Sequence, residues 1–119
     1  MHDELREDEG GEVKVYIAGP YTQGDQMRNI TRAIEAGQEL LDSGYVPFVP
    51  HLYGFWHLLY PNSYDTWLEL DLEWLKACKA LIRLPGASSG ADSEVQAAKD
   101  WGIPVYYSVQ EFLADQGAP

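Results

Sequence analysis

The sequence has little cysteine and few basic residues, and each shortage excludes a class of protein. The single cysteine, Cys78, cannot form an internal disulfide, so a disulfide framework is excluded and a reducing compartment is expected. Only 8 lysines and arginines stand against 19 aspartates and glutamates, which gives a formal net charge of −11. A nucleic acid polymer or an anionic membrane surface needs a basic patch on the protein, so we expect neither as a partner.

Long apolar runs and nucleotide-binding glycine motifs are missing as well. No stretch approaches the ~18 apolar residues of a membrane-spanning helix, and the acidic start MHDELREDEGGE lacks the apolar region of a secretory signal. Neither GxGxxG nor GxxxxGKS/T occurs, so no motif supports a dinucleotide site or a P-loop. We therefore expect a cytoplasmic protein whose residues 1–12 form a disordered acidic tail.

The chain does contain enough apolar residues, 45% of 119, for one domain with a core, which we expect over residues 13–115. β-rich runs predict strands at four places, Val13–Ala18, Tyr45–Val49, Ala80–Leu84 and Ile103–Tyr107. Helical spacing predicts helices over residues 25–43, 63–78 and 91–101 and a last turn over 109–114. In the first helix this spacing predicts an inward face at Ile30, Ile34, Gly37 and Leu41. Residues 51–62 have no clear period and are expected to form a loop with no more than one helical turn.

This alternation of strands and helices predicts an α/β fold. We expect a single-domain flavodoxin-like (Rossmann-like) parallel sheet with strand order 2-1-3-4 and helices on both faces. Ligands bind such sheets at the carboxyl ends of the strands, where the first and third strands are neighbours. The loops over residues 19–24 and 85–90 would meet there, and both are rich in Gly, Pro, Ser or Thr. We therefore expect a small-molecule pocket between these two loops.

Two carboxylates are predicted to face that crevice. Asp71 shares the apolar face of its helix with Leu68, Leu72 and Leu75, and a charge on such a face must be paired, protonated or directed into a cavity. Glu94 lies on the inward face of the helix over 91–101, in its predicted first turn, where the helix dipole favours the charged form. The alternatives are that Asp71 caps a neighbouring loop and that Glu94 only stabilises the start of its helix.

A pair of carboxylates suits the cleavage of a glycosidic bond. One carboxylate can attack the anomeric carbon or stabilise an oxocarbenium ion, while the other protonates the leaving group. The start of the helix offers groups that could hold a phosphate or a sugar hydroxyl: Ser88, Ser89 and the amides of Gly90 and Ala91.

Six aromatic residues could stack on a nucleobase, fill the core or form a subunit interface: Tyr53, Phe55, Trp56, Tyr60, Tyr64 and Trp67. His51 and His57 have no third ligand at metal-site spacing, so we expect no metal.

Three stretches, VYIAGPYTQGD, DLEWLKACKALIRLPG and SSGADSEVQAAKDWGIPV, resemble the nucleoside 2-deoxyribosyltransferase-like superfamily over residues 13–107. That group includes the transferases, the nucleoside 5′-monophosphate N-glycosidases and many short bacterial and phage proteins of unassigned function, which this chain resembles most. The resemblance implies that the domain over 13–115 is of this kind. It implies Glu94 as the nucleophile, Asp71 as the general acid and Tyr16 as a hydroxyl that supports the glutamate, and it implies phosphate binding by Ser88 and Gly90.

The loop after the first strand departs from the glycosidase pattern, because Pro20-Tyr21-Thr22-Gln23-Gly24 stands where the glycosidases carry a basic, glycine-rich loop. We expect an N-glycosidase that hydrolyses a (deoxy)nucleoside or its 5′-monophosphate without a cofactor. The alternatives are a nucleoside 2-deoxyribosyltransferase and a non-catalytic nucleotide-binding or regulatory module. The expected substrate-binding residues are Gly19, Pro20, Tyr21, His51, Ser88 and Gly90. The resemblance also implies a homodimer or a larger homo-oligomer, with residues 53–67 as the candidate interface.

Overall fold

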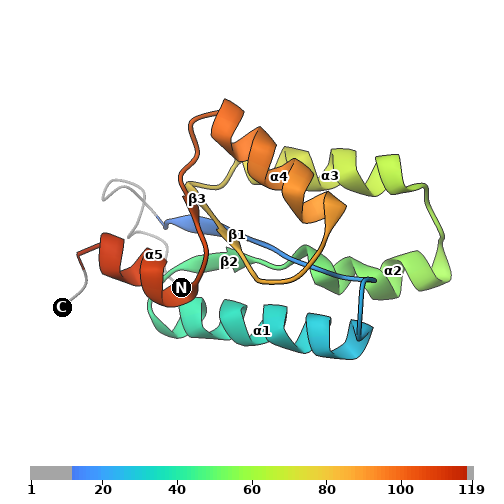
Figure 1. Cartoon of the computed structure of the whole chain (residues 1–119), viewed down its shortest axis with the longest axis horizontal. Coiled ribbons are helices and arrows are strands. Elements are labelled where there is room, and N and C mark those ends of the chain that lie inside the picture. The colour runs from blue at the N-terminus through green and yellow to red at the C-terminus, as the bar shows by residue number, and fades with distance from the viewer. Residues whose placement is uncertain (1–11, 118–119) are drawn as a thin grey trace.

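Four parallel strands form the middle layer of the fold, and helices cover both of its faces (Figure 1). The computed structural model describes residues 12–117. The strands are β1 (Lys14–Ala18), β2 (Val46–Phe48), β3 (Ala80–Arg83) and β4 (Val105–Tyr106). Their order is β2-β1-β3-β4, and every neighbouring pair is parallel. This confirms the predicted flavodoxin-like order 2-1-3-4.

The helices are divided between the two faces of the sheet. Helices α1 (Gln26–Asp42) and α5 (Val109–Asp115) lie on one face, and α3 (Tyr64–Lys76) and α4 (Ser89–Asp100) lie on the other (Figure 1). Ser63 caps α3 as predicted, since its side chain accepts a hydrogen bond from the Thr66 N–H at 3.1 Å. None of the described helices is long and apolar enough to cross a membrane.

The segment between β2 and α3 is helical, so the prediction of a loop over 51–62 is wrong for its first part. It forms the short 3₁₀ helix η2 (Pro50–Leu52) and the seven-residue helix α2 (Tyr53–Leu59). Three rings of α2 (Tyr53, Trp56 and His57) pack around Trp67 of α3, with centroid distances of 5.4–5.8 Å. This helix depends on contacts with another helix, and a search for an apolar period within the segment could not detect them.

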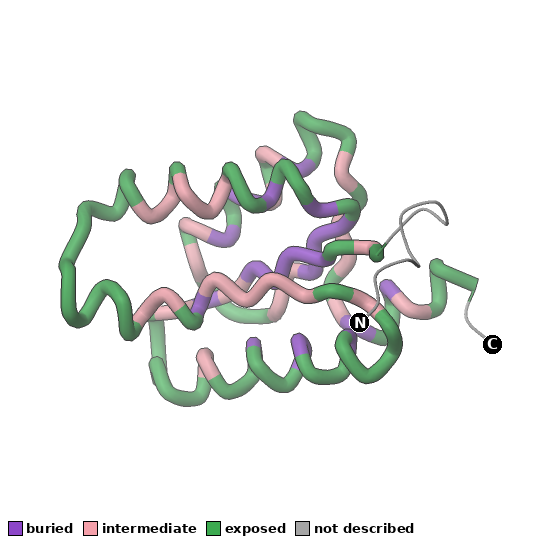
Figure 2. The backbone as a smooth tube through the Cα atoms, turned by 180° about the vertical axis from the view of Figure 1, so that it is seen from behind, coloured by how far each residue is buried: buried purple, intermediate pink, exposed green. Residues whose placement is uncertain are grey.

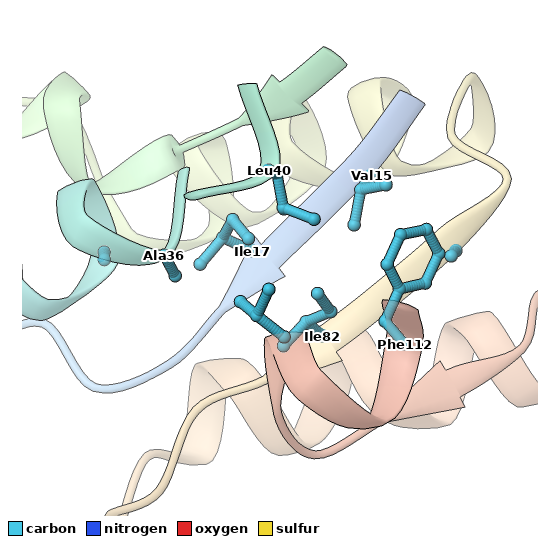
Figure 3. Packing of buried hydrophobic residues seen from close by; sticks show 9 residues of the cluster. Val15, Ile17, Ala36, Leu40, Ile82 and Phe112 are labelled. Atoms are coloured by element: carbon cyan, nitrogen blue, oxygen red, sulfur yellow. The ribbon is translucent and has the colours of Figure 1, made fainter. Parts of the chain in front are cut away.

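Alternation along β1 divides the core into two clusters. Val15 and Ile17 point toward α1 and α5, where they pack with Leu40, Ile82 and Phe112 (Figure 3). Tyr16 and Ala18 point to the opposite face, toward α3 and α4. Buried positions follow the strands and the sheet-facing sides of the helices, whereas the chain from Phe55 to Thr66 is exposed throughout (Figure 2). The face of the sheet that carries Tyr16 is therefore the face where a site can form.

Helix α1 has the predicted length but not the predicted inward face. Its buried residues are Ala33, Ala36, Gly37 and Leu40. Of the four positions expected to face the core, Gly37 is buried and Ile30 is half-buried, while Ile34 and Leu41 are 44% and 56% exposed. Small residues form the inward face because the helix lies close to the edge of the sheet. A Cβ atom at Gly37 would lie only 2.9 Å from Cγ2 of Val49. The predicted acidic tail lies outside the described residues except for Glu12.

Candidate active site

Three polar side chains from three elements meet on the α3/α4 face of the sheet. Tyr16, in the middle of β1, is fully buried, and its hydroxyl donates a hydrogen bond to Oε2 of Glu94 at 2.9 Å. Asp71 on α3 lies within hydrogen-bonding reach of Glu94 on α4. The structure therefore brings together the two acids that the spacing selects and the tyrosine that the resemblance adds.

Helix α4 begins two residues earlier than predicted, and this changes the setting of Glu94. The Ser88 side chain caps the helix by accepting a hydrogen bond from the Ala91 N–H at 3.0 Å, so the helix starts at Ser89. Glu94 then lies in the second turn, beyond the reach of the helix dipole, which acts mainly on the first turn. The predicted dipole stabilisation of its charged form is wrong.

Burial dominates the electrostatics of the two acids. It raises the pKa of Asp71 to about 7 and, together with the nearby Asp71 charge, the pKa of Glu94 to about 8. The Tyr16 hydrogen bond and the positive charge of Arg83 act in the opposite direction on the Glu94 pKa. The two carboxyls titrate as one pair that holds a single proton between the two values. Burial also raises the pKa of Tyr16 well above its usual range, so its hydroxyl remains a donor.

An open cavity of about 400 Å³ leads from Asp71 to the surface. The loop after β1, η2, α2, α3 and the start of α4 all contribute to its walls. Leu68, expected on the buried face of α3, also lines this cavity, and Leu75 is the residue of that face that is fully buried. Asp71 Oδ1 is buried without a hydrogen-bond partner among the described residues, so it is available to a ligand.

Three of the six expected substrate-binding residues, Tyr21, His51 and Gly90, line this cavity, and the other three do not. Gly19 packs against Leu84, Pro20 packs against Gly86, and Ser88 caps α4. Gly19, Pro20 and Ser88 therefore support the walls from behind, and the backbone of Gly19 and Pro20 also acts on His51 in the wall. Ser89 stands in the cavity wall beside Gly90.

His51 is a buried polar residue of the cavity wall, with 6% of its surface exposed. Neither ring nitrogen makes a well-formed hydrogen bond within the described part of the chain, although the Gly19 and Pro20 backbone lies close enough to act on the ring. Burial lowers the pKa of His51 below its ordinary value, against a smaller opposite effect of the Pro20 and Gly19 backbone, so the ring is neutral at physiological pH. A neutral imidazole with unused nitrogens can both donate to and accept from a ligand.

Two residues that shape the cavity escaped the sequence reasoning because their roles depend on contacts between elements: His57, which lines it, and Asn29, which holds a loop that lines it. Nδ1 of His57, weighed there only as a metal ligand, accepts hydrogen bonds from the Trp67 indole at 2.7 Å and the Asn62 N–H at 3.2 Å. Asn29 donates to the carbonyl oxygens of Tyr21 at 3.1 Å and Gln23 at 2.7 Å, which fixes the loop after β1. No motif in the sequence signals either arrangement.

The position of the Tyr21 ring in the cavity depends on Gly54. A Cβ atom at Gly54 would lie 1.9 Å from the Tyr21 hydroxyl oxygen, so Tyr21 can lie across α2 only where position 54 has no side chain.

In residues 12–117 no group of three or more His, Cys, Asp or Glu side chains is placed to hold a metal ion.

The carboxyl pair and the cavity lie at the carboxyl ends of β1 and β3, the topological switch point where α/β proteins of this strand order bind ligands. The chain belongs to the family described as Domain of unknown function (DUF7768), whose model matches residues 13–108.

Among solved structures the chain is similar to a 2-deoxyribosyltransferase from the psychrotolerant bacterium Bacillus psychrosaccharolyticus. The two share 22% sequence identity and a TM-score of 0.58, and the match covers 78% of this chain and 69% of that chain. At this identity the likeness shows a common fold. The comparison with curated proteins gives no match.

The carboxyl pair predicts a stability that falls as pH rises. The ordinary pKa values are 3.8 for Asp71 and 4.5 for Glu94, and the folded protein raises them to about 7 and about 8. Between the unfolded and the folded pKa values, the folded state binds more protons than the unfolded chain. The stabilisation that the pair provides is therefore complete below the unfolded pKa values and is lost as pH rises through the folded ones. The loss is at most about 1.4 kcal/mol per pH unit for each extra proton.

The measurement is urea unfolding of the wild type and of an Asp71→Asn/Glu94→Gln double variant, from about pH 5 to about pH 8. Both proteins share every other titrating group, so the difference in unfolding free energy isolates the pair. We expect the wild type to lose stability relative to the variant as pH rises. A difference that does not change with pH would contradict the raised pKa values.

Proposed function

We propose that the protein cleaves the N-glycosidic bond of a nucleoside, with Glu94 as the nucleophile and Asp71 as the general acid. The observation that carries this proposal is the Tyr16–Glu94 hydrogen bond beside Asp71, which lines the inner end of an open cavity. Glu94 and Tyr16 are not among the described residues that line the cavity, so a substrate reaches Glu94 past Asp71. A carboxylate nucleophile must be held in one orientation, and the buried Tyr16 hydroxyl meets that need. The proton shared by the pair supplies the acid.

The reaction proceeds as a double displacement. Glu94 attacks C1′ of the sugar while the C1′–N bond breaks, and the proton of Asp71 passes to the departing base. The products of this step are a glycosyl ester on Glu94 and a free base. Water then attacks C1′ and gives its proton to Asp71, which releases the sugar and restores both acids to their starting states.

The active one-proton state needs its charge on Glu94 and its proton on Asp71. The Tyr16 hydroxyl donates to Glu94, and the charge of Arg83 favours the ionised form of the same residue. Asp71 Oδ1 has no such donor among the described residues and faces the cavity. In the free pair the higher pKa belongs to Glu94, about 8 against about 7 for Asp71, so the proton lies mainly on Glu94. The active state is therefore the less populated one-proton form, and the Tyr16 and Arg83 contacts are what favour it.

The aromatic walls and the fold support a nucleoside as the ligand. Tyr53, Tyr64 and Trp67 line the cavity and offer ring faces or edges to a base. The similar structure is a 2-deoxyribosyltransferase described as a biocatalyst for nucleoside synthesis, which favours a deoxynucleoside substrate here. Transfer to a second base would share the glycosyl ester and differ only in the acceptor. The open cavity admits water, so hydrolysis is the first proposal.

A nucleoside suits the site better than its 5′-monophosphate. No lysine or arginine is among the described residues that line the cavity, and the whole chain has a net charge of −11. The N–H groups of Ser89 and Gly90 at the start of α4 and neutral side chains such as Gln23 and Asn62 are the donors that the lining offers a phosphate, while the Ser88 hydroxyl oxygen is engaged as the cap. We place the reaction in the cytoplasm, where Cys78 stays reduced.

The first test is the release of free base from a panel of nucleosides, followed by chromatography. We expect Glu94→Ala to retain less than about 1% of the wild-type kcat, because a nucleophile contributes several kcal/mol to the barrier. The profile of kcat/KM should peak between the pair's values of about 7 and about 8, and Asp71→Asn should remove its basic limb.

Glu73→Gln is the matched control, since Glu73 lies on the same helix as Asp71 with a side chain 72% exposed. Base release by Glu94→Ala at the wild-type rate would overturn the catalytic assignment. Tight binding of a nucleoside without turnover by the wild type would favour the non-catalytic module. Base release that requires a second base would favour the transferase.

The second test compares a deoxynucleoside with its 5′-monophosphate. We expect kcat/KM for the nucleoside to be at least tenfold higher, since a charge-assisted hydrogen bond to phosphate is worth roughly 1.5–3 kcal/mol and no cationic side chain lines the cavity. Gln23→Arg adds a cation to the wall and should improve the monophosphate selectively. Gln38→Arg adds the same charge on the exposed side of α1 as a control. A wild type that prefers the monophosphate would contradict this substrate assignment.

The third test concerns assembly, which we propose to be a homodimer or a larger homo-oligomer. Around α2 the exposed apolar side chains are Leu52, Phe55, Trp56, Leu58, Leu59, Tyr60 and Tyr64. Residues 51–64 contain no Asp, Glu, Lys or Arg, so two such surfaces could meet without the repulsion that a net charge of −11 otherwise imposes. Light scattering at micromolar concentration should give a multiple of the 13.4 kDa chain mass. Leu58→Asp should lower that mass with an unchanged circular dichroism spectrum, and a wild-type mass of one chain would contradict assembly.

A further inference from the structure

Arg83 is a largely buried cation behind the carboxyl pair. It is the last residue of β3, and alternation from Leu81 turns its side chain toward the α3/α4 face, with 11% of that side chain exposed. Its Nη1 donates to the carbonyl oxygens of Leu84 at 2.5 Å and Gly86 at 2.8 Å. Its Nη2 pairs with Oδ1 of Asp92 at 2.9 Å. One guanidinium group therefore joins the turn after β3 to the first turn of α4.

The turn that Arg83 holds supports the loop on the opposite side of the switch point. Gly86 has a φ of +115°, and a Cβ atom there would lie 2.7 Å from Cγ of Pro20. Leu84 packs on Gly19, and its N–H donates to the Ala18 carbonyl at 2.8 Å. The two backbone bonds of Arg83 thus stabilise the contact between the loops that follow β1 and β3.

The Asp92 contact connects Arg83 to the nucleophile's helix. Asp92 lies in the first turn of α4, two residues before Glu94. The ionisable groups that act on Glu94 are Asp71 from α3, Tyr16 from β1 and Arg83 from β3. Arg83 is the cation of this set, and it is not among the residues that line the cavity. It can therefore influence the pair without contacting a ligand.

We propose that Arg83 is a positioning residue that fixes the start of α4, through Asp92 and the turn over 84–86, so that Glu94 stays on the Tyr16 hydroxyl. This rests on the proposed role of Glu94 as the nucleophile. The same guanidinium favours the ionised form of Glu94, which a double displacement requires. Arginine suits the position because its planar fork satisfies two carbonyls and one carboxylate together, which a lysine ammonium cannot reproduce with the same geometry.

The test uses Arg83→Met, Arg83→Lys and Asp92→Asn, with Arg32→Met on the exposed side of α1 as the control. The first readout needs no substrate: carbon-13 NMR titration of the side-chain carboxyls, assigned with Glu94→Gln and Asp71→Asn. We expect Arg83→Met to raise the titration midpoint of the pair by about half a pH unit or more. Arg83→Lys should leave that midpoint near the wild-type value, because the charge is kept.

The second readout is the split between kcat and KM for base release. We expect Arg83→Met and Arg83→Lys to lower kcat about tenfold, because Glu94 loses its alignment. KM should rise by a smaller factor, because the start of α4 forms only part of the cavity wall. Asp92→Asn should lower kcat to a lesser degree, and it serves as the folded variant if Arg83→Met does not fold. The control should match the wild type in both readouts.

Two outcomes separate this inference from the proposed function. The inference would be overturned if Arg83→Met or Asp92→Asn lowered stability but left both kcat and the titration midpoint unchanged. Arg83 would then only stabilise the fold. A wild type that releases no base from any nucleoside would overturn the proposed function, and a shifted midpoint in Arg83→Met would still show that Arg83 acts on Glu94.

Discussion

Two carboxyl groups buried side by side must share a proton or find donors, and that requirement governs the α3/α4 face of the sheet. Tyr16 supplies one donor from the fully buried centre of β1. Arg83 adds a positive charge from the end of β3. Asp71 is left with an unused oxygen beside the cavity. Glu94 and Asp71 are both carboxyl groups, and it is their different neighbours that give them different roles in the proposed reaction.

The opposite face of the sheet provides the stability that such a site consumes. The described cluster between the sheet, α1 and α5 consists of apolar residues, with Val15, Ile17, Leu40 and Ile82 almost completely excluded from water (Figure 3). Each fully buried aliphatic side chain contributes roughly 1.5–3 kcal/mol. Alternate side chains of the five-residue strand β1 thus point to opposite faces: Val15 and Ile17 pack in the apolar core, and Tyr16 contacts the carboxyl pair.

The fold was predictable from the sequence because it depends on local patterns. The runs VKVYIA and ALIRL with their following Gly-Pro and Pro-Gly pairs mark strands that end at a ligand edge. The α/β alternation predicts a parallel sheet, and the flavodoxin-like order, one of the common orders for such a sheet, is the one observed. The inward face of α1 was misassigned because apolarity predicts Ile34 and Leu41, whereas the approach of the helix to Val49 requires Gly37 and small alanines. Helix α2 was missed because its stability comes from Trp67.

The site was predictable only in part, for the same kind of reason. Asp71 and Glu94 stand out as acids on apolar helix faces, and Tyr16 entered through the resemblance alone. Arg83, Asn29 and His57 act on backbone carbonyls or on rings from other elements, and no spacing rule describes such contacts. The start of α4 was placed two residues late because the composition of Ala87-Ser88-Ser89-Gly90 indicates a loop, whereas Ser88 caps the helix and Ser89 and Gly90 are its first residues. That displacement changed the predicted electrostatics of Glu94.

The contact between Tyr21 and Gly54 makes the shape of the cavity a property of two positions that lie 33 residues apart in the chain. A side chain at position 54 and the Tyr21 hydroxyl in its present place exclude each other, because both would occupy the same volume. A relative with alanine or a larger residue at the position of Gly54 must therefore have a different residue at the position of Tyr21, a different path of the loop, or a tyrosine whose ring points elsewhere. The pair would divide the family into members with differently shaped cavities, even where the buried acids are the same.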